Sequence, residues 1–187
     1  MKSITRTIRI LAISGSLRKI SSNTALLQAA IALAPENVEI KLYAGLGNLP
    51  HFNPDLEASE PPSVKDLRMQ LRWSDGLLIS SPEYAHGVPG VLKNALDWLV
   101  SGEEFVNKPV ALLNASPRST HAQASLIEIV TVMSGRIVPE ASITVPLLGK
   151  NLDAAGIASH PEISRALQAA IVAFVSKIER WQTEVKY

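Results

Sequence analysis

The chain has 187 residues, enough for one α/β domain with a core that needs no covalent staples, and we expect a single domain over residues 1–187. Hydrophobic residues make up 47% of the chain and charged residues 19%, as in folded globular proteins, which excludes a disordered chain. The net charge is +1 and no basic block is present, so we expect no binding to nucleic acid.

The absence of cysteine excludes disulfides, thiolate metal sites, cysteine nucleophiles and dithiol redox chemistry. A protein of this composition that moves electrons therefore needs a bound cofactor. The four histidines (His51, His86, His121 and His160) are far apart and lack the HExxH spacing, so no metal site is predicted. The first apolar run is too short for a membrane span or a secretory signal, and we expect a cytoplasmic protein without membrane association.

The first third of the chain predicts a strand, a helix and a second strand. Ile8–Ser14 is a β-branched apolar run that Gly15 interrupts, which is typical of a buried central strand. Leu26, Ala30 and Leu33 then recur at helical spacing, so a helix is expected over about 23–34, and Val38–Leu42 supplies the second strand.

A proline-rich segment follows, over residues 45–63, with Pro50, Pro54, Pro61 and Pro62 and little periodicity. We expect a long ordered loop there, and loops of this length often serve as lids or partner surfaces.

The rest of the chain continues the alternation of helices and strands. Helices are expected from Val64, Leu67 and Leu71, over 92–99, over 122–133 and over 163–181, and strands over 76–81, 110–114 and 143–145. Five strands alternating with five helices predict a flavodoxin-like, three-layer doubly wound α/β fold with a five-stranded parallel sheet of order 2-1-3-4-5. In that order the switch point, where ligands bind, lies between the first and third strands.

The loop after the first strand, Gly15 to Asn23, is rich in hydrogen-bond donors and leads into a helix. Ser16, Ser22 and Asn23 supply neutral donors, and Arg18 supplies a positive fork suited to phosphate oxygens. The loop carries neither the Walker A pattern nor GxGxxG, which favours a mononucleotide phosphate over ATP or a pyrophosphate. The alternative is that Ser21, Ser22 or Asn23 merely caps the helix.

The loop after the third strand runs from Pro82 to Gly90. Its prolines and glycines predict a rigid turn with exposed backbone, and Tyr84 adds an aromatic surface. Such a turn suits a flat heteroaromatic ring with carbonyl and nitrogen edges. The alternative is a tight connection with Tyr84 packed in the core.

These two loops resemble the signatures of a known family. The matching residues are Gly15-Ser16-Leu17-Arg18-Lys19 with Ser22-Asn23, and Pro82-Glu83-Tyr84 with Gly87, Pro89-Gly90 and Leu92-Lys93-Asn94-Ala95-Leu96-Asp97-Trp98. Together they look like the NADPH-dependent FMN reductase family, which includes flavin, quinone, chromate and azo-dye reductases. The resemblance extends from about residue 8 to residue 98.

The resemblance implies where bound FMN would lie. Its phosphate would be held by Ser16, Arg18, Ser22 and Asn23, and its ring would lie against Pro82, Glu83, Tyr84 and Gly87. A third loop, after the fourth strand, would close the site with Ser116 at a hydroxyl-bearing position. Here the chain departs from the pattern, because residues 116–121 stand where many members carry a glycine-rich stretch.

The implied function is an oxidoreductase in which NADPH or NADH passes a hydride to flavin N5, leaves, and is replaced by a small-molecule acceptor such as a quinone, free flavin, chromate or an azo compound. The flavin carries the chemistry, so no catalytic side chain is predicted. Homodimers or homotetramers are common in the family and are expected here. The first alternative is a noncatalytic flavodoxin-type FMN electron carrier, against which the slight positive charge argues. The second is a member that has lost activity, which the altered third loop would favour.

Overall fold

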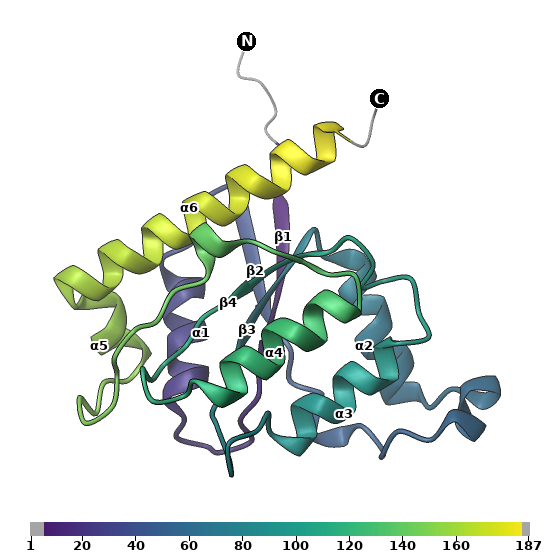
Figure 1. The fold of residues 1–187 in the computed structure, drawn as a ribbon. Coiled ribbons are helices and arrows are strands. Elements are labelled where there is room, and N and C mark those ends of the chain that lie inside the picture. The colour runs from purple at the N-terminus through teal and green to yellow at the C-terminus, as the bar shows by residue number, and fades with distance from the viewer. Residues whose placement is uncertain (1–5, 185–187) are drawn as a thin grey trace.

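The computed structural model describes residues 6–184, which form a five-stranded parallel sheet of order β2-β1-β3-β4-β5 (Figure 1). The strands are β1 (Ile8–Ser14), β2 (Val38–Leu42), β3 (Gly76–Ser80), β4 (Pro109–Leu112) and β5 (Arg136–Ile137). The predicted flavodoxin-like fold and strand order are therefore confirmed.

Six α-helices lie within residues 6–184 and cover both faces of the sheet; the first four connect successive strands, and the other two follow the last strand. They are α1 (Ser22–Ala32), α2 (Pro62–Trp73), α3 (Gly90–Leu99), α4 (His121–Val132), α5 (Ala154–Ser159) and α6 (Pro161–Glu184). Figure 1 shows α1 and α6 on one side of the sheet and α2, α3 and α4 on the other.

The alternation of side chains along β1 explains the two layers. Ile8, Ile10 and Ala12 belong to the core cluster that includes α1, α5 and α6, whereas Leu11 and Ile13 belong to the cluster that includes α2, α3 and α4. Successive side chains of a strand point to opposite faces, so an unbroken apolar run buries both faces at once.

The fifth strand lies elsewhere than predicted. The strand is Arg136–Ile137, which pairs with Pro109 and Val110 of β4, and residues 143–145 form only an isolated bridge between Thr144 and Asn114. A 3₁₀ turn, η3 (Pro139–Ala141), separates the two segments. Proline has no N–H for the ladder and favours such a turn, so the edge of the sheet is interrupted there. Short helix α5 is a further element that periodicity did not predict.

The proline-rich segment contains two 3₁₀ helices, η1 (Leu46–Asn48) and η2 (Pro54–Ser59), and is anchored to α3. Asn94 accepts a hydrogen bond from the Phe52 amide (2.7 Å), and its Nδ2 donates to the Pro50 carbonyl (3.0 Å). Trp98 Nε1 donates to the same carbonyl (2.8 Å). Asn94 and Trp98 of α3 therefore serve internal packing.

None of the helices described here combines the length and the hydropathy that crossing a bilayer requires.

Candidate functional site

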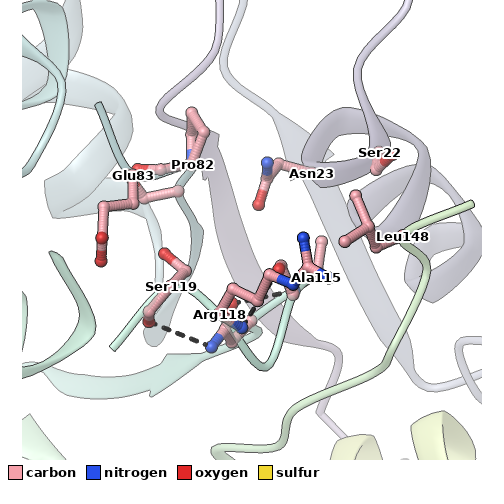
Figure 2. A pocket seen from close by; sticks show the side chains of 11 residues that line it. Ser22, Asn23, Pro82, Glu83, Ala115, Arg118, Ser119 and Leu148 are labelled. Carbon is pink, nitrogen blue, oxygen red and sulfur yellow. Dashed lines mark hydrogen bonds between the residues drawn. The ribbon is translucent and has the colours of Figure 1, made fainter. Parts of the chain in front are cut away.

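Three loops, after β1, β3 and β4, converge at the carboxyl edge of the sheet and enclose a cavity of about 330 Å³. We call it the main cavity; its lining residues are Ser22, Asn23, Ser81, Pro82, Glu83, Asn114, Ala115, Ser116, Arg118, Ser119 and Leu148. Figure 2 shows Asn23 and Pro82 along one side of it and Arg118 and Ser119 along the other. It lies at the switch point between β1 and β3, where open α/β sheets bind ligands.

The close approach of the first two loops depends on Gly15. Its amide donates to the Ser80 carbonyl at the end of β3 (2.8 Å). A Cβ at this position would come within 2.7 Å of Ser81 Oγ, so a larger residue would push the loops apart.

The amino end of α1 forms one wall of the main cavity. Ser21 is the N-cap: its hydroxyl oxygen accepts from the Thr24 amide (3.4 Å) and its carbonyl from the Ala25 amide (2.8 Å). The amides of Ser22 and Asn23 have no acceptor within residues 6–184. Ser21 therefore caps the helix, as the alternative expected, and two N–H groups at the positive end of the helix dipole remain able to bind an anion.

Side chains behind this wall hold it in place. Asn23 is buried, and its Oδ1 accepts a hydrogen bond from Ser80 Oγ (2.9 Å). Ser16 is also buried, and its hydroxyl oxygen accepts from the Arg18 amide (3.3 Å). Ser14 and Thr24 share a further hydrogen bond (2.7 Å) that ties β1 to α1. These contacts fix the loop backbone before any ligand arrives.

The second loop is a tight turn in which Tyr84 and Gly87 exchange two hydrogen bonds, of 3.2 and 3.0 Å. The residues in the left-handed region are Ala85 (φ 49°) and His86 (φ 60°), which differs from the expectation that the glycines shape the turn. Two consecutive left-handed residues are the geometry of a two-residue hairpin turn. Tyr84 is 53% exposed, so the alternative that it packs in the core is wrong.

The second and third loops are fastened to each other. The Glu83 carboxylate accepts a hydrogen bond from the Ala122 amide at the start of α4 (2.9 Å). The rings of His86 and His121 stack with centroids 4.3 Å apart and an interplanar angle of 16°. Both histidines are exposed, and their stacked rings help to join the turn of residues 84–87 to α4.

The third loop is organised by Asn114. Its Oδ1 accepts from the Ser116 amide (3.0 Å), and its Nδ2 donates to the Ser119 carbonyl (3.4 Å). Asn114, Arg118, Ser119 and Leu148 line the main cavity but were not predicted as site residues. The polar residues after the fourth strand were a usable signal for the first three, whereas Leu148 is brought in by the tertiary fold.

The predicted site residues fall into three groups. Ser22, Asn23, Pro82, Glu83 and Ser116 line the main cavity. Arg18 and Tyr84 line a neighbouring cavity of about 490 Å³, together with Gly15, Leu17, Pro89, Gly90 and Val91. Ser16 and Gly87 are absent from the linings of both cavities. Within the described residues, no group of three or more histidine and carboxylate side chains is placed to hold a metal ion.

The sequence comparisons agree with this geometry. Residues 8–147 match the family described as NADPH-dependent FMN reductase. The chain belongs to this family. A protein named Probable NADPH:quinone oxidoreductase 2, from Oryza sativa subsp. japonica, is 31% identical over 172 residues, which cover 87% of this chain and 85% of the relative.

Other matches are partial or structural. A protein named NAD(P)H-dependent FMN reductase, from Pseudomonas aeruginosa, is 46% identical over 112 residues, 58% of this chain and 60% of the relative. The chain thus spans about three fifths of the first curated relatives it matches. The structure of FerB, titled a flavoenzyme NAD(P)H:(acceptor) oxidoreductase from Paracoccus denitrificans, superposes with a TM-score of 0.83 at 30% identity, covering 93% of this chain and 98% of that one. The predicted cofactor FMN and co-substrate NADPH are those of the family name.

Proposed function

We propose that this member of the NADPH-dependent FMN reductase family is an FMN-dependent NAD(P)H oxidoreductase of the flavin- or quinone-reductase type. The observation that carries the proposal is the amino end of α1, where the amides of Ser22 and Asn23 have no acceptor within residues 6–184 and both residues line a cavity at the switch point of the sheet. The cavity lies at the lower end of the volume range of small-molecule sites. The donors at the amino end of α1 are neutral hydroxyls and amides, which fit a phosphomonoester.

The FMN phosphate would be held at the amino end of α1. The amides of Ser22 and Asn23 face the cavity, and the helix dipole favours negative charge there. Ser16 supports the loop backbone, and Arg18 lies beside it as an exposed cation able to swing onto a phosphate oxygen.

The isoalloxazine ring would lie between the second and third loops. Pro82, Glu83 and Ser116 line that part of the cavity, and Tyr84 and Gly87 form the turn at its border. The Glu83 carboxylate is occupied by the Ala122 amide, so Glu83 would meet the ring through its backbone. Fixed loops of this kind position a ring without paying for reorganisation when it binds.

Bound FMN would supply the redox chemistry, with hydride passing from the nicotinamide of NADPH or NADH to N5 and the electron pair then passing to a small-molecule acceptor. The side chains of the main cavity would bind and orient. Glu83 is the one carboxylate in its described lining and is held by a hydrogen bond, so we assign no acid–base pair. Quinones, free flavin, chromate and azo compounds are the acceptor classes we propose, in a cytoplasmic homodimer or homotetramer.

The test is an absorption spectrum of the purified protein, followed by oxidation of NADPH and NADH with each class of acceptor. We expect a flavin spectrum and an FMN-dependent consumption of reduced coenzyme. FMN binding without coenzyme oxidation would indicate an electron carrier instead. A protein that neither retains nor takes up FMN would contradict the proposal.

A further inference from the structure

Arg118 sits at the tip of a rigid turn in the third loop. The Ser119 amide donates to the Ser116 carbonyl (3.1 Å), which closes a β-turn with Pro117 at its second position. The Arg118 amide also donates to Ser116 Oγ (3.2 Å). Proline at that position fixes the backbone, and Asn114 holds the base of the turn, so the loop presents the arginine in a set place.

The charge of Arg118 is not compensated by its neighbours. It is the one basic residue in the described lining of the main cavity, and Glu83 is the one acidic residue there. The Glu83 carboxylate is directed to the start of α4 by its hydrogen bond to the Ala122 amide. Within residues 6–184 the Arg118 guanidinium makes neither an ion pair nor a side-chain hydrogen bond.

Arg118 lies on the loop that the proposed function places over the ring. It lies across the cavity from Asn23 and Pro82 (Figure 2), on the loop that closes the cavity over the proposed ring position. Arg18 instead lines the neighbouring cavity with Tyr84. The two arginines therefore serve different parts of the surface.

Resting on the proposed function, we infer that Arg118 makes the main cavity selective for the reduced, negatively charged flavin ring. A hydride brings two electrons and one proton from NADPH, which leaves as NADP⁺, so the ring gains one negative charge. The phosphate carries the same charge before and after, so a cation beside the phosphate would not distinguish the two states. A cation beside the ring stabilises only the reduced state. Because Arg118 is exposed, solvent screens its charge and the expected effect is modest.

The test uses the FMN-loaded protein and sulfite as the probe. Sulfite donates its lone pair to flavin N5 and places a negative charge on the ring without any coenzyme. We expect Arg118→Gln to raise the sulfite dissociation constant about fivefold, the size of one unit charge acting across a partly solvated distance. The ratio of affinities for reduced and oxidised FMN should fall by a similar factor.

Two variants control the measurement. Arg118→Lys keeps the charge and should stay close to the wild type. Arg165→Gln removes an exposed arginine of α6 outside both cavities and should change nothing. Glutamine at position 118 keeps the backbone amide that bonds Ser116, so the turn should persist.

Two results would overturn the inference while leaving the proposed function intact. One is an Arg118→Gln protein that binds FMN and sulfite as the wild type does. The other is a rise in KM for NADPH but not NADH with unchanged sulfite binding, which would assign Arg118 to the coenzyme phosphate. A wild-type chain that binds no FMN would overturn the proposed function, and the inference with it.

Discussion

Two polar clusters of this protein use hydrogen-bond donors in opposite ways. The amides of Ser22 and Asn23 at the start of α1 have no acceptor within residues 6–184, and both residues line a cavity. Arg68, in contrast, is buried and its charge is paired: its guanidinium donates to Glu104 (3.1 Å), the Trp98 carbonyl (2.7 Å) and Ser101 (3.0 Å), and Nε forms an ion pair with Glu60 (2.5 Å).

The difference separates a binding site from a structural fastening. The Arg68 cluster joins α2 to the proline-rich segment and to the end of α3, and its charges are already paired inside the protein. At the start of α1, in contrast, two amides have no acceptor within the described residues, and their residues line the main cavity. The first amides of a helix have no partner within the helix, and at α1 they belong to residues that line a cavity, so they are available to a ligand under the proposed function.

The largest expected effect is on the paired cluster. Arg68→Ala should lower the free energy of unfolding by about 3–5 kcal/mol, because it leaves the buried Glu104 carboxylate without its buried cation. Urea denaturation measures this directly. Arg72→Ala is the matched control: Arg72 binds the same carboxylate (2.6 Å) but is 69% exposed, so its loss should cost less than about 1 kcal/mol. Equal losses of stability in Arg68→Ala and Arg72→Ala would contradict the conclusion that Arg68 is the main cation paired with the buried Glu104 carboxylate.

The second prediction compares the effects of one substitution at the start of α1 on stability and on FMN binding. Ser22→Asp should weaken FMN binding by about ten- to a hundredfold, since a carboxylate beside the phosphate repels it. The negative charge of the same aspartate interacts favourably with the helix dipole, so the FMN-free protein should be equally or slightly more stable. Fluorescence titration with FMN and thermal melting of the FMN-free protein report the two effects. Tighter FMN binding would refute the phosphate position.

The third prediction concerns Tyr43, a buried polar group outside the proposed site. Its hydroxyl has no hydrogen-bond partner within the described residues, and Tyr43 lines neither of the two cavities discussed above. Burial, with a smaller contribution from the Asp66 carboxylate, raises the pKa of Tyr43 from 10.0 to about 12. The raised pKa favours the neutral hydroxyl, so this stabilisation is present below pH 10 and is lost as the pH rises through 12.

Tyr43→Phe should therefore flatten the loss of stability between pH 10 and pH 12. At neutral pH it should be neutral or stabilise the fold by about 1 kcal/mol, since a buried unpartnered hydroxyl is removed. Denaturation curves across this pH range provide the measurement. A variant that loses stability at pH 7 would show that the hydroxyl has a partner.

The smallest expected effect is at the turn of residues 84–87. Ala85→Gly removes a side chain from a left-handed residue and should stabilise the protein by about 0.5 kcal/mol or less, because glycine also gains entropy in the unfolded chain. Gly87→Ala is the companion variant: a Cβ there would meet only the Tyr84 carbonyl at 3.7 Å, so the fold should tolerate it. Weaker FMN binding in Gly87→Ala, with unchanged melting, would support ring contact at that position.

Most of the fold could be predicted from local pattern. The runs Ile8–Ser14 and Val38–Leu42 are strands with the predicted bounds. The first is a central strand, buried on both faces and therefore almost wholly apolar, whereas the second is an edge strand in which buried Val38 and Ile40 alternate with exposed Glu39 and Lys41. The edge of the sheet could not be predicted in the same way. β5 is two residues long and pairs on one side, so its position depends on Lys108 and Val110 carbonyls that the sequence does not bring together.

The amino-acid sequence by itself determined the strand order, the two loops at the switch point and the family of the protein, because these rest on periodicity and on short contiguous motifs. The tertiary structure alone decided how those residues divide between two cavities, how Glu83 is occupied by α4 and how Arg118 comes to face the main cavity. Such facts depend on distances between segments far apart in the chain, and on which hydrogen bonds are already made inside the protein.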